Sequence, residues 1–212
     1  MDNKKNTILL TVIAVATLLV AVVGATFAYF TAQGGDAVSK QVNVITGTAG
    51  NSSFAIDGAI NIYADATTFA QGKGNATGSS NGTVSFTAPG AAGGQTPDAA
   101  DLQFCYSVSL NITANDFAYT VNESTPELTL DVTKEGTAVI AAMDITTKKG
   151  EIKIPATAGE TNYVHKITAA AGATVTEAWK TTVTLINLDS DQNANTGKNL
   201  TGVLTFDKAN CA

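Results

Sequence analysis

The segment Leu102–Ile112 reads LQFCYSVSLNI, and its side chains alternate between two kinds. Large apolar residues occupy every second position from Leu102 to Ile112, whereas Gln, Cys, Ser and Asn occupy the positions between them. Successive side chains of a β-strand point to opposite faces, so the pattern predicts a strand with one apolar and one polar face. Half-buried strands of this kind are typical of antiparallel sheets.

Other segments rich in Thr and Val follow along the chain, separated by breaks that contain Gly and Asn, and no helical period is evident beyond residue 30. Many short strands predict an all-β fold, an antiparallel β-sandwich or jelly roll. The further predicted strands are Val38–Thr46, Phe54–Ala64, Thr83–Ala88, Phe117–Val121, Glu127–Lys134, Thr137–Thr146, Glu151–Ile154, Asn162–Thr168, Thr174–Leu188 and Leu200–Phe206.

Two stretches between residues 71 and 101 differ from the rest in composition. Gln71–Gly82 is rich in Gly, Asn and Ser, and Pro89–Asp101 is rich in Gly and Ala with two prolines. Such composition predicts mobile surface loops around the short strand Thr83–Ala88. The expected organisation is an N-terminal segment (1–28), an arm (29–47) and a β-sandwich domain (48–212).

The N-terminal segment has the character of an export signal. Lys4 and Lys5 precede an uncharged apolar run, Thr7–Ala28, and the next charged residue is Asp36. Small residues at the end of the run suit a signal peptidase, which we expect to cut between Ala28 and Tyr29.

Three readings of this segment remain open. The run is as long as the roughly 20 residues that span a bilayer, so a retained transmembrane helix is an alternative to cleavage. The lysines hold the N-terminus inside in either case, so the remainder is expected to be secreted or displayed on the cell surface. A pilin-type leader is a third reading, although the acidic residue expected after its cleavage site is missing.

Composition excludes some partners. The 212-residue chain has a formal net charge of −6, and its twelve basic residues are all Lys. Nucleic-acid binding requires clustered cations, and arginine supplies the bidentate contacts to guanine, so neither nucleic acid nor an anionic membrane surface is an expected partner. The 44% of hydrophobic residues is sufficient for a core.

The chain has two cysteines, Cys105 and Cys211. A cysteine pair in an exported chain predicts a disulfide, and Cys105 lies on the polar face of its predicted strand, where a C-terminal tail could reach it. Closing a loop of about 100 residues adds up to about 4.7 kcal/mol in the chain-entropy model. Two free thiols are the alternative.

Motifs of catalysis are missing from the sequence, and we do not expect an enzyme. A zinc hydrolase needs several metal ligands, but His165 is the one histidine, and no H-E-x-x-H, G-x-S-x-G or phosphate-binding loop is present. A Cys105–His165 nucleophile would be removed by the disulfide. Trp179 shares the apolar face of its predicted strand, so a core position is favoured over a sugar-stacking one.

One loop resembles the beginning of a calcium-binding loop. Carboxylate and amide side chains alternate at Asp189, Asp191, Asn193 and Asn195. The turn glycine and the final glutamate of an EF-hand are replaced by Ala194 and Leu200. The alternative is a polar connection in which Asn and Asp side chains stabilise turns.

The junction Gly24-Ala25-Thr26-Phe27-Ala28-Tyr29-Phe30, after the lysines and the apolar run, resembles that of the TasA/camelysin type of secreted proteins of Gram-positive bacteria, with their SipW-dependent type of signal. The block Trp179–Phe206 also resembles the C-terminal half of exported proteins with that signal. Residues 48–100 show no such resemblance. The resemblance implies a dedicated signal peptidase, a jelly-roll-like sandwich and a role in extracellular fibres. The metalloprotease activity ascribed to camelysin does not carry over, because a lone histidine provides no zinc site.

In such fibres the N-terminal arm of one subunit completes the sheet of the next, with the same protein or other matrix proteins as partners. Here the arm would be Tyr29–Thr46, and its apolar contacts would come from Tyr29, Phe30, Val38, Val42 and Val44. The alternative is an arm that folds back onto its own sheet. The sequence therefore favours a self-assembling protein of the cell surface or biofilm matrix. A membrane-anchored adhesin with a site on loops 71–101 or 187–198 is the main alternative, and a pilin-like subunit and a secreted hydrolase are two others.

Overall fold

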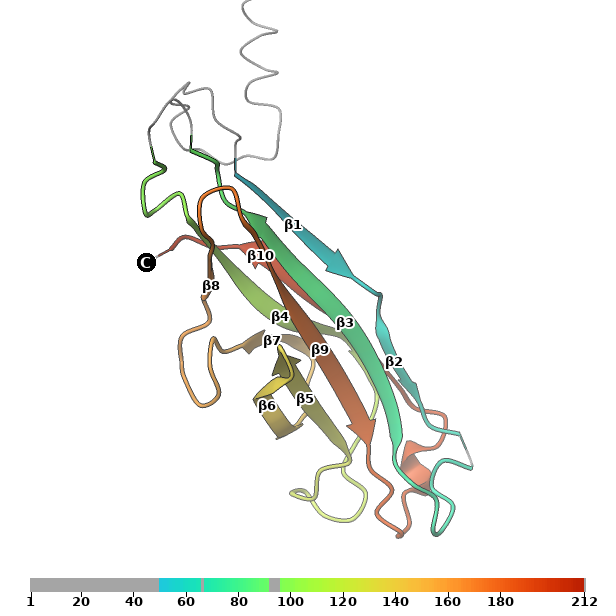
Figure 1. Ribbon diagram of the computed structural model, residues 1–212. Helices are drawn as coiled ribbons and strands as arrows, with labels where there is room; N and C mark the ends of the chain where they lie inside the picture. The colour runs from blue at the N-terminus through green and yellow to red at the C-terminus, as the bar shows by residue number, and fades with distance from the viewer. Residues whose placement is uncertain (1–49, 66, 92–95, 212) are drawn as a thin grey trace, which may run out of the picture. The chain divides into compact units, whose positions relative to one another are not determined.

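The computed structural model describes residues 50–65, 67–91 and 96–211, and its regular structure consists of strands and one short 3-10 turn (Figure 1). The predicted segment 1–28 and the arm 29–47 lie outside these residues. No helix within the described ranges combines the length and the apolar character needed to cross a membrane. The elements are β1 (Asn51–Ile56), β2 (Ile60–Tyr63), β3 (Ala76–Thr87), β4 (Gln103–Asn115), β5 (Leu128–Lys134), β6 (Thr137–Asp144), β7 (Gly150–Ile154), β8 (His165–Thr168), β9 (Thr174–Leu185), η1 (Asn193–Asn195) and β10 (Asn199–Lys208).

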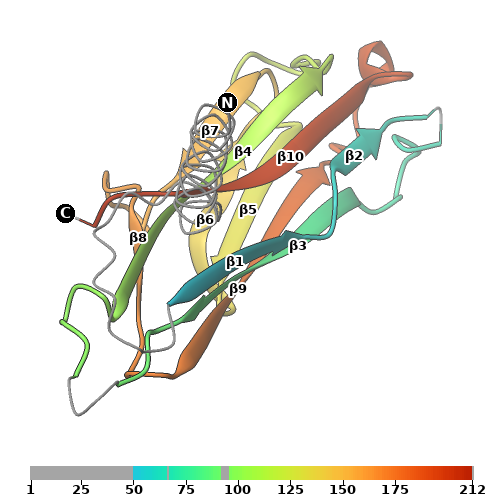
Figure 2. The ribbon, with the colours of Figure 1, turned by 90° about the horizontal axis from the view of Figure 1, so that it is seen from above.

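The strands form two antiparallel sheets that pack face to face, which confirms the predicted all-β, sandwich-like fold (Figure 2). Sheet A has the order β1-β3-β9-β5-β6, and sheet B has the order β2-β10-β4-β7. Strand β8 pairs with the first residues of β4, beyond the stretch of β4 that pairs with β7.

The pairing of the strands is nested along the chain. Strand β2 pairs with β10, β3 with β9, β4 with β7, and β5 with β6, so early strands pair with late ones around a central hairpin. Lateral pairs join β10 to β4 and β9 to β5. Because most partners are far apart in sequence, sheet formation depends on long-range contacts.

The segment Leu102–Ile112 forms most of β4, as predicted. Its apolar face is buried from Tyr106 to Ile112, while Leu102 and Phe104 are half-buried at the start of the strand. On β9, Trp179, Val183 and Leu185 share one face and are buried, all at 1% exposure or less, whereas Val175, on the same face, is half-buried. The period-2 pattern therefore identified the two central strands of the core.

The predicted strand Phe54–Ala64 is wrong as a single element. It is divided into β1, which pairs with β3 in sheet A, and β2, which pairs with β10 in sheet B. Gly58, between them, has φ of 138°, which side chains other than glycine rarely adopt. The chain therefore crosses from one sheet to the other at this glycine.

The predicted loop Gln71–Gly82 is also partly wrong, because β3 already begins at Ala76. The glycines that suggested a loop instead allow side chains of the facing sheet to approach the β3 backbone. A Cβ at Gly82 would lie 2.5 Å from Cε2 of Phe206, and one at Gly78 would lie 3.0 Å from Cδ1 of Ile62. Gly is thus used here for close packing.

Phe117–Val121 does not form the strand that was predicted. The backbone N–H and C=O of Ala118 are bonded to the side-chain amide of Asn195, at 3.1 and 2.8 Å. A side chain therefore takes the place of a neighbouring strand.

The other predicted strands within the described residues, apart from the extended β3, are present with ends that differ by three residues or fewer.

We expect Gly82→Ala to lower the free energy of unfolding by about 1–3 kcal/mol, because the new methyl group overlaps the ring of Phe206. Urea unfolding followed by tryptophan fluorescence measures this change. Gly74→Ala is the matched control, since Gly74 is exposed and a Cβ there meets nothing within 4 Å. Equal stability of the two variants would contradict the close approach.

Candidate functional site

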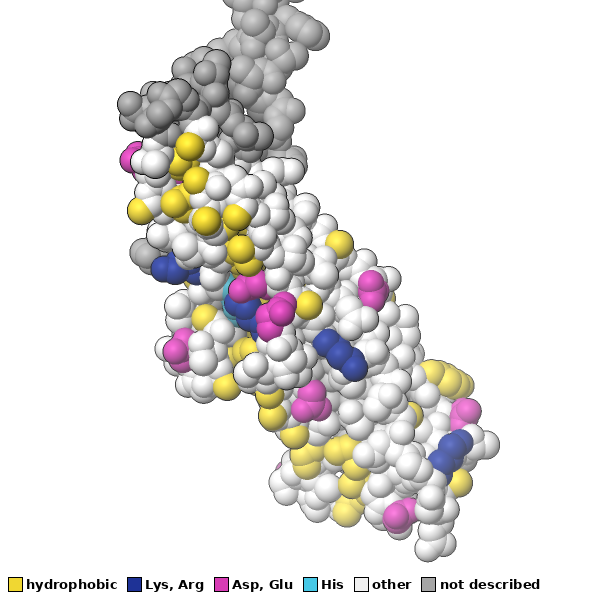
Figure 3. Space-filling view, in the orientation of Figure 1, with side chains coloured by type: hydrophobic (Ala, Val, Ile, Leu, Met, Phe, Trp, Pro, Cys, Tyr) yellow, Lys and Arg dark blue, Asp and Glu magenta, His cyan; other side chains and the backbone are white. Residues whose placement is uncertain are grey.

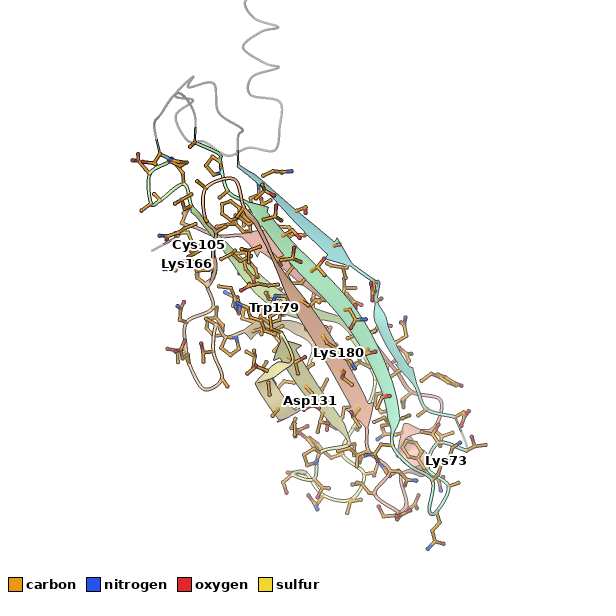
Figure 4. All side chains as sticks on the ribbon, viewed as in Figure 1. Lys73, Cys105, Asp131, Lys166, Trp179 and Lys180 are labelled. Atoms are coloured by element: carbon orange, nitrogen blue, oxygen red, sulfur yellow. A yellow bond between two sulfur atoms is a disulfide. The ribbon has the colours of Figure 1, made fainter. Side chains whose placement is uncertain are left out.

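Cys105 and Cys211 form a disulfide, as predicted, with their Cα atoms 5.3 Å apart. Cys105 lies on β4 opposite Lys166 of β8 (Figure 4), and its carbonyl accepts a hydrogen bond of 3.0 Å from the Ala209 N–H. The bond ties the segment after β10 to the beginning of β4, an inner strand of sheet B. Both cysteines are consumed in it, so the Cys105–His165 nucleophile has no free thiol.

A set of rings from both sheets fills one end of the core, and we call it the aromatic cluster. Its rings lie 4.8–6.4 Å apart between centroids, in stacked, tilted and edge-on arrangements that stabilise such pairs. The predicted core position of Trp179 is confirmed by its 1% exposure, which leaves no face for a sugar. The members are Phe54, Phe86, Phe104, Tyr106, His165, Trp179 and Phe206.

The polar atoms of the aromatic cluster form a chain that ends in an ion pair. The Trp179 Nε1–H donates to the Tyr106 hydroxyl at 3.1 Å, and that hydroxyl donates to Glu177 Oε2. The Lys134 ammonium lies 2.7 Å from Glu177 Oε1 and also faces the Trp179 ring at 5.7 Å. Burial, together with the hydrogen bond to Glu177, raises the pKa of Tyr106 above its usual range, so the phenol remains neutral.

His165 is 2% exposed and lies among these groups. Its Nε2 is 3.1 Å from the carbonyl oxygen of Ile154, while Nδ1 has no hydrogen-bond partner within the described residues. Figure 3 shows basic and acidic side chains next to one another on this face of the molecule. Burial, reinforced by the nearby Lys134 charge, lowers the pKa of His165, and the Ile154 bond and Glu177 oppose this only in part. Its neutral, packed form fits a structural role in the core.

A second buried polar group lies where the loops before β5 and before β10 meet. The Glu127 carboxylate is 1% exposed and accepts hydrogen bonds on both oxygens. Oε1 accepts from the backbone N–H of Thr120 and, at 2.7 Å, from its hydroxyl. Oε2 accepts from Gln192 Nε2 at 2.9 Å and from Asn195 Nδ2 at 2.6 Å. This Glu127 network joins the two loops, and no lysine of the described residues forms an ion pair with it.

The four candidate calcium ligands belong to this loop, but their oxygens face different partners. Asn195 is buried and its Oδ1 accepts from Ala118 N, Asp191 Oδ1 accepts from Asn193 N, and Asp189 Oδ1 accepts from Gly72 N. No group of three or more His, Cys, Asp or Glu side chains suited to a metal is present within residues 50–65, 67–91 and 96–211. Calcium at this loop stays a prediction.

Sequence reasoning missed Glu127, Gln192 and Gly82, because their roles depend on partners far along the chain. Gln192 stands in a polar stretch of the sequence, yet its side chain is 1% exposed. Glu127 was read as the first residue of a strand. A local signal for it was the position of an acidic residue next to the apolar run of β5, with Pro126 before it.

The edges of the two sheets differ in how well they resist pairing with a further strand. Strand β6 has register shifts and Ala142 at φ of 47°, β7 carries Glu151 and Lys153, and β2 has four residues. Strand β1 has six residues without charge or proline, and its pairing with β3 is regular. Nothing in the described part of the chain pairs with its outer side. Charges, prolines and bulges normally protect edges, so β1 is the edge most open to addition of a strand.

The remaining residues predicted from the sequence belong to the N-terminal segment and the arm. The cleavage junction, Ala28 and Tyr29, and the arm residues Phe30, Val38, Val42 and Val44 lie outside the described residues. Comparisons with protein-family models, with curated protein sequences and with solved structures found no match to this chain.

We expect stability to fall as the pH is lowered below about 6.5, the ordinary pKa of histidine. Because the pKa of His165 is lowered in the folded state, the unfolded chain binds more protons in this window. The free energy of unfolding should therefore decrease by at most about 1.4 kcal/mol per pH unit between pH 6.5 and the folded pKa, and be constant above pH 7. Urea unfolding at pH 5.5–7.5 measures it.

His165→Phe is the matched variant, because it keeps an aromatic ring in the cluster and removes the only histidine. Its stability should be nearly independent of pH in the same window. A slope equal to that of the wild type would assign the pH dependence to another group.

Asn195→Ala should lower the free energy of unfolding by about 3 kcal/mol, because Ala118 and Glu127 lose buried hydrogen bonds together. Asn193→Ala, two residues away and exposed, should change it by less than about 0.5 kcal/mol. Thermal or urea unfolding compares the two variants, and similar losses would show that the amide of Asn195 is not essential.

Proposed function

We propose that this chain is an exported structural protein of the cell surface or biofilm matrix, which assembles when the arm 29–47 of one copy adds a strand to β1 of the next. The observation that carries the proposal is the uncharged, regular outer edge of β1. In sequence, the predicted strand Val38–Thr46 comes shortly before β1. A head-to-tail contact between an arm and an edge does not close, so it propagates into a fibre.

We propose further that the sandwich is jelly-roll-like. Support comes from the nested pairing of β2 with β10, β3 with β9, β4 with β7 and β5 with β6. Eight strands paired in this way and wrapped into two sheets correspond to the double Greek-key arrangement of a jelly roll. Strand β1 is additional to these eight, at the edge of sheet A.

The position of β1 suits an acceptor edge. Its Phe54 stacks on Phe206 of sheet B at 5.7 Å and contacts the Phe104 ring at 5.9 Å, so the strand is anchored to the core. The partner strand would be held by main-chain hydrogen bonds and by its alternating valines. The alternative occupant is the arm of the same chain, since Gly47–Gly50 is short enough for a hairpin loop.

Export is supported by the Cys105–Cys211 disulfide, because such bonds persist in oxidising compartments. The basic start and apolar run of residues 1–28 supply the corresponding signal. The threonines and serines on the outer face of β3 and β9 are exposed or half-buried, which suits a protein whose outer faces remain in water.

Electron microscopy and light scattering of purified residues 29–212 test the proposal. We expect fibres whose growth depends on concentration, and soluble monomers after deletion of residues 29–47. Ser53→Lys combined with Ala55→Lys places two charges on β1 and should block assembly with little change in stability, since both positions are exposed.

Ser79→Lys is the control, because Ser79 is an exposed residue of β3, which is an inner strand of sheet A. This variant should assemble normally. Monomers at high concentration with the arm intact would contradict assembly and favour the membrane-anchored binding module. Normal assembly of the β1 double variant would contradict β1 as the acceptor.

A further inference from the structure

The Glu127 network brings a hydroxyl group and two carboxamides to one buried carboxylate. Thr120 Oγ1 donates to Oε1 at 2.7 Å, and Gln192 Nε2 donates to Oε2 at 2.9 Å. Four donors occupy the two oxygens, which matches the acceptor capacity of an ionised carboxylate. An ionised carboxylate at hydrogen-bond distance from a hydroxyl can act as its general base.

The carbonyl group of Gln192 is also polarised. Its Oε1 accepts a hydrogen bond of 2.7 Å from the backbone N–H of Leu188. A donor at this distance stabilises negative charge that develops on a carbonyl oxygen under attack. Gln192 is 1% exposed, so little water reaches the amide and the Leu188 bond is strengthened. A nucleophile and the amide nitrogen that would leave are therefore both hydrogen-bonded to one base, and the carbonyl of that amide is polarised.

We propose that Thr120 and Gln192 form an intramolecular ester with loss of ammonia. Thr120 Oγ1 attacks Cδ of Gln192 while its proton passes to Glu127, and the Leu188 N–H holds the tetrahedral oxygen. The C–N bond then breaks, Glu127 returns the proton to the departing nitrogen, and ammonia leaves. One C–O bond replaces one C–N bond, and the step needs no oxidant, reductant or added reactant.

Gln192 is favoured over Asn195 by its hydrogen bonds. Both amides pair with backbone groups, Asn195 with those of Ala118 and Gln192 with Leu188 N–H and Ile186 C=O. The oxygen of Gln192 receives the shorter hydrogen bond, 2.7 Å compared with 3.1 Å at Asn195, so its carbonyl is the more strongly polarised. An ester at Gln192 would join the loop before β5 to the loop before β10 at the end of the sandwich where these loops meet. This inference is independent of assembly through the arm.

Intact-mass spectrometry of the purified full chain tests the ester. The wild type should be lighter than its sequence mass by one ammonia, about 17 Da, after allowance for the disulfide. Thr120→Val and Glu127→Gln should have their full masses, whereas Thr120→Ser should still lose ammonia. Peptide mapping should find one linked pair that contains Thr120 and Gln192 and that separates on treatment with hydroxylamine.

Thr181→Val is the control, because Thr181 is a buried threonine on β9 whose hydroxyl has no partner within the described residues. This variant should lose ammonia as the wild type does. A wild type of full sequence mass would overturn the ester. Loss of ammonia that persists in Thr120→Val would also overturn it, because ring closure at Asn81-Gly82 would produce the same change of mass. A link mapped to Asn195 would overturn it as well.

Discussion

The packing of Tyr106 against Trp179 between the two sheets is the contact on which most of this structure depends. Their strands, β4 and β9, are central in sheets B and A, and each is paired on both sides. Two large side chains buried at 1% exposure or less provide much apolar burial at this point. Their polar atoms remain bonded to each other and to Glu177, so the burial leaves no unmet hydrogen bond.

The Glu127 network holds the loops together, as the Tyr106–Trp179 contact holds the two sheets. Backbone groups that leave a sheet need other partners when they are buried. Asn195 supplies two of them for Ala118, and Glu127 accepts from Thr120, Gln192 and Asn195 together. The loops are therefore held together by side chains rather than by strand pairing. The same network places a buried carboxylate beside a hydroxyl and an amide, the groups from which the proposed ester would form.

The edges of the two sheets differ in how well they resist pairing with a further strand. Most edges are interrupted, short or charged, whereas β1 is regular and is anchored through Phe54 to the aromatic cluster. Strand addition at β1 and covalent closure of the loops rest on different observations, so each stands or falls by its own experiment.

By itself, the sequence determined the strands whose side chains alternate locally, among them β4 with Tyr106 and β9 with Trp179, and it predicted the disulfide that the structure contains. Only the tertiary structure decided that Gly58 divides one predicted strand between two sheets, that Gly82 receives the ring of Phe206, and that Asn195 replaces a strand partner for Ala118. The reason is physical: alternation is a property of neighbouring residues, whereas close approach and hydrogen-bond exchange depend on residues brought together by folding.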